Sequence, residues 1–187
     1  MTRRRIVLVS GAPAAGKTSL AVPLAKLLGL PLIAKDDIKE TLVDVLGDHD
    51  GDLAWSRQVG GAAMELLWKL AERAPATVLE ANFRPHSAYE RERLTRLEAR
   101  IVEVYCRCPA EVLMRRFHER AKSAHAAHPA TDLTPEWIAE FDRPMGLGAV
   151  IEVDTTRPVD VQALAVQVAA LLDGPWETAP FQTGVLP

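Results

Sequence analysis

The chain has 187 residues, of which 48% are hydrophobic and 25% are charged, and its formal net charge is −3. This composition is typical of one soluble globular domain with its own core, and it excludes a disordered chain. The slightly acidic balance argues against a dedicated nucleic-acid-binding protein, which is usually clearly basic. The two cysteines, Cys106 and Cys108, form no disulfide framework, which favours a reducing compartment.

No apolar run in the chain approaches the ~20 residues of a membrane-spanning helix. Arginines at 3–5 precede an apolar run, as in a secretory signal, but that run, 6–9, has only four residues. A signal core needs roughly 7–15 apolar residues. We therefore expect a cytoplasmic protein without a membrane partner.

The first predicted elements are a buried strand ending at Ser10, a loop and a helix over 17–28. Residues 11–18 read G-x-x-x-x-G-K-T, the pattern of a phosphate-binding loop. Its glycines let the backbone pass close to phosphates, and its N–H groups form a nest for anions at a helix N-terminus. Lys17 is expected to reach the β- and γ-phosphates, and the Thr18 hydroxyl to bind Mg²⁺. The expected nucleotide-binding residues here are Gly11, Ala12, Pro13, Ala14, Ala15, Gly16, Lys17, Thr18 and Ser19.

A short second strand over 31–34 is followed by a helix that begins with Asp36 and Asp37. The carboxyl ends of strands in an open α/β sheet face the ligand crevice, so Asp36 is expected on the side of the phosphate loop. There its carboxylate can accept the proton of a hydroxyl that attacks the γ-phosphate. Asp37 is expected as a cap or helix-start residue, which is the ordinary use of an aspartate at this position. The helix is expected to bury Ile38, Leu42, Val45 and Leu46.

A long helix over 53–74 precedes a third strand, 77–82, that ends in polar residues. The glycine pair at 60–61 makes this helix a candidate wall of an acceptor site, because small residues let a ligand come close. Glu80 is a candidate for holding Mg²⁺-bound water. Asn82 and Arg84 are expected to extend into the crevice as substrate-binding residues. Alternatively, these side chains only cap the helix that follows.

After a charged helix over 90–99 and a fourth strand over 101–106, Pro109 starts a helix that carries Arg116 and Arg120. Their spacing of four places both arginines on one helix face. Arginine runs usually lie on solvated faces, but these precede a loop-like stretch over 123–135. The combination indicates a lid that aims arginines at phosphates.

Cys106, Cys108, His125 and His128 could in principle form a zinc site, although their spacing matches no familiar finger.

The last expected elements are a fifth strand over 149–153 and a helix over 160–172. The loop between them could wrap a purine base, which makes Thr155 and Arg157 nucleotide-binding candidates. We expect one domain over 1–172 with a helical lid at about 115–145. The Pro- and Gly-containing tail, 173–187, is expected to pack loosely.

The loop at 11–18, the aspartate pair and the arginine helix resemble the small P-loop kinases of AAA type grouped with polynucleotide kinase, chloramphenicol phosphotransferase and the zeta toxins. Bacteriophage polynucleotide kinase has the pattern G-x-P-x-x-G-K-[ST], followed by an R-D-D motif. This chain has Gly11-Ala12-Pro13-Ala14-Ala15-Gly16-Lys17-Thr18 and then Lys35-Asp36-Asp37-Ile38-Lys39.

The resemblance implies an α/β P-loop NTPase fold with a five-stranded parallel sheet in the order 2-3-1-4-5, flanked by helices. It makes Asp36 the acceptor base and Arg116 and Arg120 the lid arginines. It also places Asp37 and Lys39 at the acceptor. Lysines at 35 and 39 stand where arginines are expected, and Glu80 stands where an aspartate is expected.

The leading hypothesis is an ATP-dependent kinase that phosphorylates a hydroxyl of a small molecule, such as an antibiotic, a nucleoside or a sugar derivative. Its cofactors are ATP, with GTP as an alternative, and Mg²⁺. A polynucleotide 5′-hydroxyl kinase needs a basic channel for the strand, which the charge of −3 does not favour. A nucleotide-hydrolysing switch protein has no need of Asp36.

Overall fold

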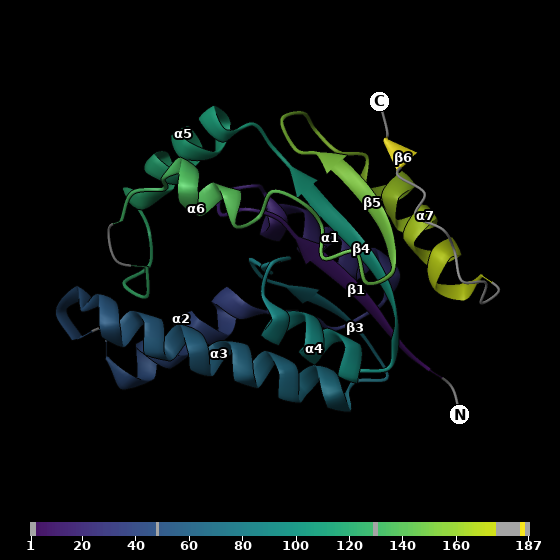
Figure 1. Ribbon diagram of the computed structural model, residues 1–187, viewed down its shortest axis with the longest axis horizontal. Helices are drawn as coiled ribbons and strands as arrows, with labels where there is room; N and C mark the ends of the chain where they lie inside the picture. Colours follow the sequence, from purple (N-terminus) through teal and green to yellow (C-terminus); the bar gives the residue numbers. More distant parts are fainter. Residues whose placement is uncertain (1–2, 48, 129–130, 175–183, 186–187) are drawn as a thin grey trace.

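The fold is built on a parallel sheet whose strands follow the order β2-β3-β1-β4-β5-β6 (Figure 1). The computed structural model describes residues 3–47, 49–128, 131–174 and 184–185. The strands are β1 Arg4–Ser10, β2 Leu32–Ala34, β3 Ala76–Glu80, β4 Ala99–Arg107, β5 Ala149–Asp154 and β6 Gly184–Val185. The predicted five parallel strands in the order 2-3-1-4-5 are confirmed.

One or two of the described α-helices lie between each strand and the next along the chain. They are α1 Lys17–Leu28, α2 Lys35–Leu46, α3 Leu53–Arg73, α4 Ala88–Arg96, α5 Ala110–Ala121, α6 Pro135–Ala139 and α7 Val161–Asp173, with a short 3₁₀ turn at His49–Gly51. Among these described helices, none combines the length and the hydrophobicity that a membrane crossing requires.

The sheet continues one short strand beyond the predicted five, because β6 pairs in parallel with β5. This strand lies within 173–187, the segment that was expected to be a loosely packed tail. Residues 175–183 and 186–187 of that segment lie outside the described part of the chain.

Two apolar layers cover the two faces of the sheet. Alternate residues of β1 point to opposite faces, as expected for a strand with period two. Val7 and Val9 join the core under α1 and α7, whereas Ile6 and Leu8 join the core under α3 and α4. Figure 1 shows α7 beside β5 on one side and α3 and α4 on the other. The central strands are therefore buried on both faces, which explains their nearly continuous apolar sequence.

Helix α2 does not bury the face expected from its apolar residues. Val45 and Leu46 are 78% and 54% exposed, while Lys39 and Val43 are buried. The reason is that α2 packs mainly on α3 and touches the sheet little. The prediction that Val45 and Leu46 are buried is therefore wrong. The buried face of α2 instead contains Lys39.

Glu103 is a fully buried carboxylate in the middle of β4. It accepts hydrogen bonds from the Ser10 hydroxyl at 2.6 Å and from the backbone amides of Met145 and Gly146, both at 2.9 Å. Ser10 directly precedes the phosphate-binding loop, so Glu103 ties that loop to the segment that leads into β5.

Replacing Glu103 by alanine is expected to lower the free energy of unfolding by about 2–5 kcal/mol, because it leaves buried donors without an acceptor. Urea denaturation of the purified protein measures this loss. The matched variant Glu92→Ala, which removes an exposed ion pair with Arg96, is expected to change stability by less than about 1 kcal/mol. Equal losses in the two variants would show that the buried network contributes nothing.

Candidate functional site

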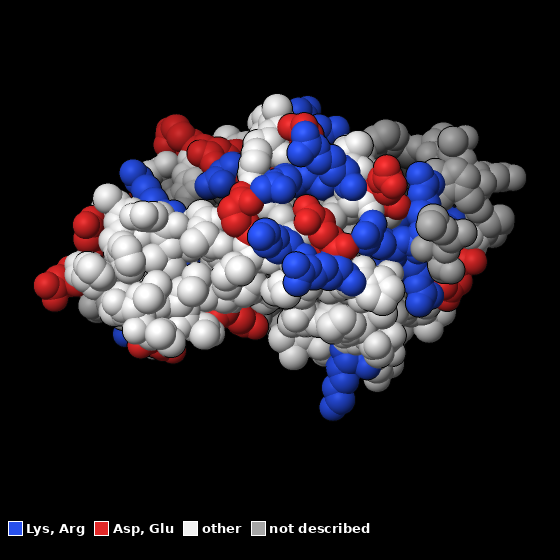
Figure 2. All heavy atoms as spheres, turned by 90° about the horizontal axis from the view of Figure 1, so that it is seen from below, with Lys and Arg blue, Asp and Glu red and all other residues white. Residues whose placement is uncertain are grey.

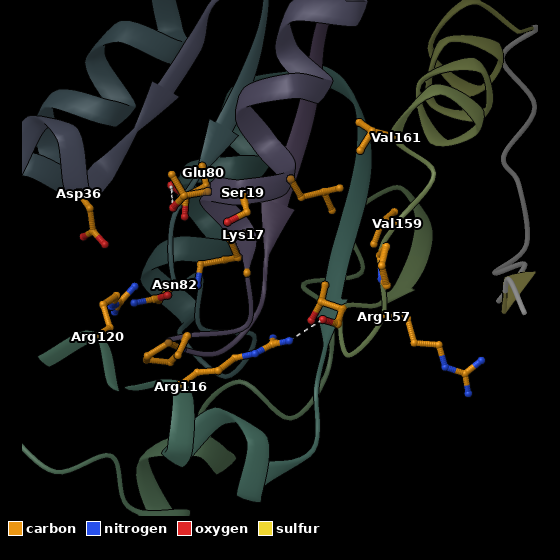
Figure 3. A pocket seen from close by; sticks show the side chains of 17 residues that line it. Lys17, Ser19, Asp36, Glu80, Asn82, Arg116, Arg120, Arg157, Val159 and Val161 are labelled. Atoms are coloured by element: carbon orange, nitrogen blue, oxygen red, sulfur yellow. Dashed lines mark hydrogen bonds between the residues drawn. The ribbon is translucent and has the colours of Figure 1, made fainter. Parts of the chain in front are cut away.

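A cavity of about 460 Å³ opens along the loop between β1 and α1 (Figure 3). Its walls come from the phosphate-binding loop, from the ends of β2 and β3, from α5 and from the segment between β5 and α7. The lining residues are Pro13, Ala14, Gly16, Lys17, Thr18, Ser19, Leu20, Asp36, Glu80, Asn82, Arg116, Arg120, Thr155, Arg157, Pro158, Val159 and Val161.

The loop adopts backbone angles that most residues avoid. Gly11, Ala14 and Gly16 have φ values of 133°, 63° and 79°. A Cβ on Gly11 would lie 2.6 Å from the carbonyl oxygen of Cys106, so glycine is required there. An alanine in the left-handed region costs of order 1–3 kcal/mol and is typical of ligand-binding turns. Such turns direct successive N–H groups toward one point, where an anion can bind.

The N-terminus of α1 adds to this anion site. Its N-cap, Gly16, offers no side-chain acceptor to the first turn, and that turn contains no acidic residue. The amides of the first turn therefore remain available to an external acceptor, and the helix dipole favours a negative one.

Lys17 lies at the centre of the cavity wall with only 7% of its surface exposed. Its Nζ donates to the carbonyl oxygen of Ala12 at 2.8 Å. Burial lowers the pKa of Lys17, while the carboxylates of Glu80 and Asp36 act in the opposite direction. An ammonium group has three donors, so a bound anion can satisfy it further.

Glu80 and Thr18 supply the oxygens that a cation would need. The Thr18 hydroxyl donates to Oε2 of Glu80 at 3.3 Å, and Glu80 is 3% exposed. Burial raises the pKa of Glu80, and the charge of Lys17 opposes this effect. The described residues contain no cluster of three or more His, Cys, Asp or Glu side chains that could enclose a metal. A hydroxyl and one carboxylate therefore fit Mg²⁺ that takes its other ligands from phosphates and water.

Asp36 lies at one end of the cavity, beyond Lys17 and near Asn82 and Arg120 (Figure 3). Its Oδ1 accepts a hydrogen bond from Nζ of Lys35 at 3.0 Å. Burial by itself raises the pKa of Asp36, but the charge and hydrogen bond of Lys35 outweigh it, so the pKa lies below its ordinary value. Asp36, which lines the cavity and has one carboxylate oxygen held by Lys35, is therefore ionised near neutral pH.

Replacing Lys35 by methionine is expected to raise the pKa of Asp36, because burial then acts without the opposing cation. Activity that depends on the ionised carboxylate is lost as pH falls through that pKa, so the acid limb of the rate–pH profile should move to higher pH. Turnover measured from pH 4 to 8 tests this. An acid limb at the same pH in the variant and the wild type would contradict the role of Lys35.

Arg116 and Arg120 reach the cavity from α5. Arg116 Nη2 donates to the carbonyl oxygen of Thr155 at 2.9 Å, which joins α5 to the segment after β5. Arg120 lies over the ring of Phe117, 5.9 Å from its centroid, and its charge acts on Lys17. The two arginines thus occupy different parts of the cavity, with Arg120 at the end that holds Asp36 (Figure 3).

Comparison with known proteins identifies the family. A family model described as an AAA domain (AAA_33) matches residues 6–144. The chain belongs to this AAA domain family. No curated protein matches the chain in sequence.

Solved structures share the fold of this AAA domain. A presumed kinase from Chloroflexus aurantiacus j-10-fl is 29% identical, with a TM-score of 0.78 over 92% of this chain and 100% of the other. Shikimate kinase from Acinetobacter baumannii, solved with shikimate, is 18% identical, with a TM-score of 0.57 over 91% and 93%. APS kinase from Mycobacterium tuberculosis, solved with AMPPNP and APS, is 20% identical, with a TM-score of 0.58 over 93% and 100%.

Most of the residues expected from the sequence lie together in the AAA domain. Ala12 and Ala15 are buried behind the loop, and Gly11 packs against β4, so these three support the cavity without lining it. Arg157 lines the cavity, but its side chain points away from the other labelled residues (Figure 3).

Three expected substrate-binding residues are not brought to the cavity. Asp37 is exposed beside it. Lys39 donates to Ser56 and Ala127, and Arg84 pairs with Glu90 and Glu140.

The four candidate zinc ligands do not come together either. His125 and His128 pair with Asp44 and Glu40, and Cys108 lies beside Arg116.

One end of the cavity is apolar and is formed by Leu20, Pro158, Val159 and Val161. Sequence reasoning reached Pro158, in the loop that was expected to wrap a purine base, but missed the other three. The signal for the two valines was their place directly after that loop, on either side of Asp160. Lys35 was also missed as the partner of Asp36, because its importance depends on where its amino group points.

Proposed function

We propose that the protein is an ATP-dependent kinase that transfers the γ-phosphate to a hydroxyl group of a small molecule. The observation that carries the proposal is Asp36. An ionised carboxylate, held by Lys35, faces the same cavity as Lys17, at the end that Arg120 also reaches. A protein that only binds and hydrolyses a nucleotide has no need of this group.

Different lining residues of the cavity suit the nucleotide base, the phosphates and the metal ion. The apolar end, with Val159 and Val161, suits a nucleotide base, and the loop with Lys17 suits the phosphates. Thr18 would hold Mg²⁺ directly and Glu80 through water. Bound Mg²⁺ supplies neutralisation of the charge on the phosphate oxygens.

At the other end, Asp36 accepts the proton of the acceptor hydroxyl as that oxygen forms its bond to the γ-phosphorus. The bond from phosphorus to the β–γ bridging oxygen breaks, and the nucleoside diphosphate leaves with that oxygen. Lys17, Arg116 and Arg120 face the oxygens on which negative charge is spread during this step.

The charges near Asp36 favour a small acceptor over a polynucleotide. Lys35, Lys39 and Arg84 are each engaged by other groups of the protein, so they do not form a free channel for a phosphate backbone. On the face shown in Figure 2, anionic side chains lie among the cationic ones in the centre of the view. The structural neighbours solved with shikimate and with APS support a small-molecule acceptor.

A screen of phosphoryl transfer tests the proposal. Purified protein, Mg²⁺ and γ-labelled ATP or GTP are incubated with aminoglycosides, phenicols, nucleosides, sugars and single-stranded oligonucleotides. Label is expected in a small hydroxyl compound and to depend on Asp36. Label transferred only to oligonucleotides would support the polynucleotide alternative, and turnover unaffected by every acceptor would support a hydrolase.

A further inference from the structure

Lys39 is a buried cation that joins three segments distant in sequence. It belongs to α2, is 7% exposed, and donates to Oγ of Ser56 on α3 at 2.7 Å. It also donates to the carbonyl oxygen of Ala127, in the chain after α5, at 2.6 Å. Ser56 donates to the same carbonyl oxygen at 3.1 Å. A buried ammonium is costly unless its donors are satisfied, and here the protein itself supplies the acceptors.

Further contacts near Lys39 tie segment 125–128, which follows α5, to α2. His128 Nε2 lies 2.9 Å from Oε1 of Glu40, and His125 Nε2 lies 3.0 Å from Oδ1 of Asp44. The methyl group of Ala127 is 1% exposed and packs with Val43 and Val59 in a small core separate from the two cores of the sheet. Figure 1 shows this segment descending from α5 to α2.

We propose that Lys39 is a positioning residue that sets Arg120 against Asp36 by anchoring segment 125–128 to the pair of helices α2 and α3. This inference rests on the proposed kinase function. Asp36 and Lys39 lie one turn apart on α2, and Arg120 lies near the end of α5, seven residues before Ala127. One helix therefore carries the acceptor base and also fixes the chain that leads from the arginine.

The ammonium of Lys39 suits this role better than a direct contact with a substrate. Its Nζ is turned toward Ala127 and Ser56, and it does not line the cavity. Burial, together with the charge of Lys35, lowers the pKa of Lys39 to about 8. One of its two short hydrogen bonds holds the backbone carbonyl of Ala127 and the other holds the Ser56 hydroxyl, and no apolar side chain could make either.

Hydrogen exchange tests the anchoring without any acceptor. Lys39→Met is expected to accelerate amide exchange in 122–128 by about 10- to 100-fold, because charged hydrogen bonds of this kind are lost, and to leave β1 and β4 unchanged. Ser56→Ala, a milder change that keeps the lysine, is expected to do so to a smaller extent. The control Lys69→Met removes an exposed lysine of α3 and is expected to change nothing. Unaltered exchange in both Lys39→Met and Ser56→Ala would overturn the anchoring.

A double-mutant cycle tests the positioning. Lys39→Met is expected to lower kcat by about 10- to 100-fold, with the Kd of a non-hydrolysable ATP analogue within about threefold of wild type. If Lys39 acts through Arg120, the double variant with Arg120→Ala should have the kcat of Arg120→Ala alone. Multiplied losses would show a general structural effect and overturn the positioning. If the wild type phosphorylates no acceptor while Lys39→Met still accelerates exchange in 122–128, the kinase function is refuted and the anchoring stands.

Discussion

Replacing Asp36 by asparagine is expected to lower kcat for phosphoryl transfer by about 10²–10⁴, the usual contribution of a positioned general base. The amide keeps the shape of the side chain and cannot accept the proton of the acceptor hydroxyl. Nucleotide affinity should stay close to that of the wild type, because Asp36 lies at the acceptor end of the cavity. Single-turnover kinetics together with calorimetric titration of an ATP analogue separate the two effects.

The neighbouring residue provides a matched control for this prediction. Asp37→Asn makes the same chemical change on the same helix, in a side chain that is exposed and lies outside the cavity lining. We expect it to cost at most a few-fold in kcat. Transfer at the wild-type rate in Asp36→Asn would refute its role as base, and a large loss confined to Asp37→Asn would assign that role to the other aspartate.

Removing Arg120 is expected to produce the second large loss. Arginines that stabilise a phosphoryl group during transfer contribute about 10³–10⁵ in rate, and Arg120 is the arginine at the end of the cavity that holds Asp36. Arg120→Ala should therefore lower kcat by a factor in this range. Arg116→Ala should lower kcat less than Arg120→Ala does and should also raise the KM for ATP, because Arg116 bonds to Thr155 in the segment next to the apolar end.

The neighbouring Arg115 serves as the control for this pair, because it is exposed on α5 and does not line the cavity. Steady-state kinetics of Arg115→Ala should match the wild type. If Arg120→Ala also retained full kcat, Arg120 would have no part in transfer and its assignment as a lid arginine would be wrong.

The fold was predictable because its signals are local. The helix over 17–28 ends at Gly29, which has a φ of 64°, as expected of a glycine that terminates a helix. The order of the first five strands came from the resemblance of the phosphate loop and aspartate pair to known kinases. The sixth strand was not predictable, since two residues carry no periodicity.

The site was predictable only in part, because its details depend on contacts between distant segments. Lys39 was expected at the acceptor from the resemblance to known kinases. Its actual partner, the carbonyl oxygen of Ala127, lies 88 residues along the chain and is a backbone atom, which no sequence pattern marks. Arg84 was expected in the crevice, but it is held by Glu90 and by Glu140, which lies 56 residues away.

The register between β2 and β3 has a consequence for how such an enzyme could change its substrate. Ala34, the last residue of β2, pairs with Glu80, and Asp36 follows Ala34 by two residues in the first turn of α2. The proposed base and the proposed metal carboxylate therefore lie at the ends of adjacent strands. Neighbouring strands lie about 4.8 Å apart whatever their side chains, so the sheet fixes the spacing between the proposed proton acceptor and the proposed metal site. Substitutions outside these two strands can then change the proposed acceptor while that spacing stays the same.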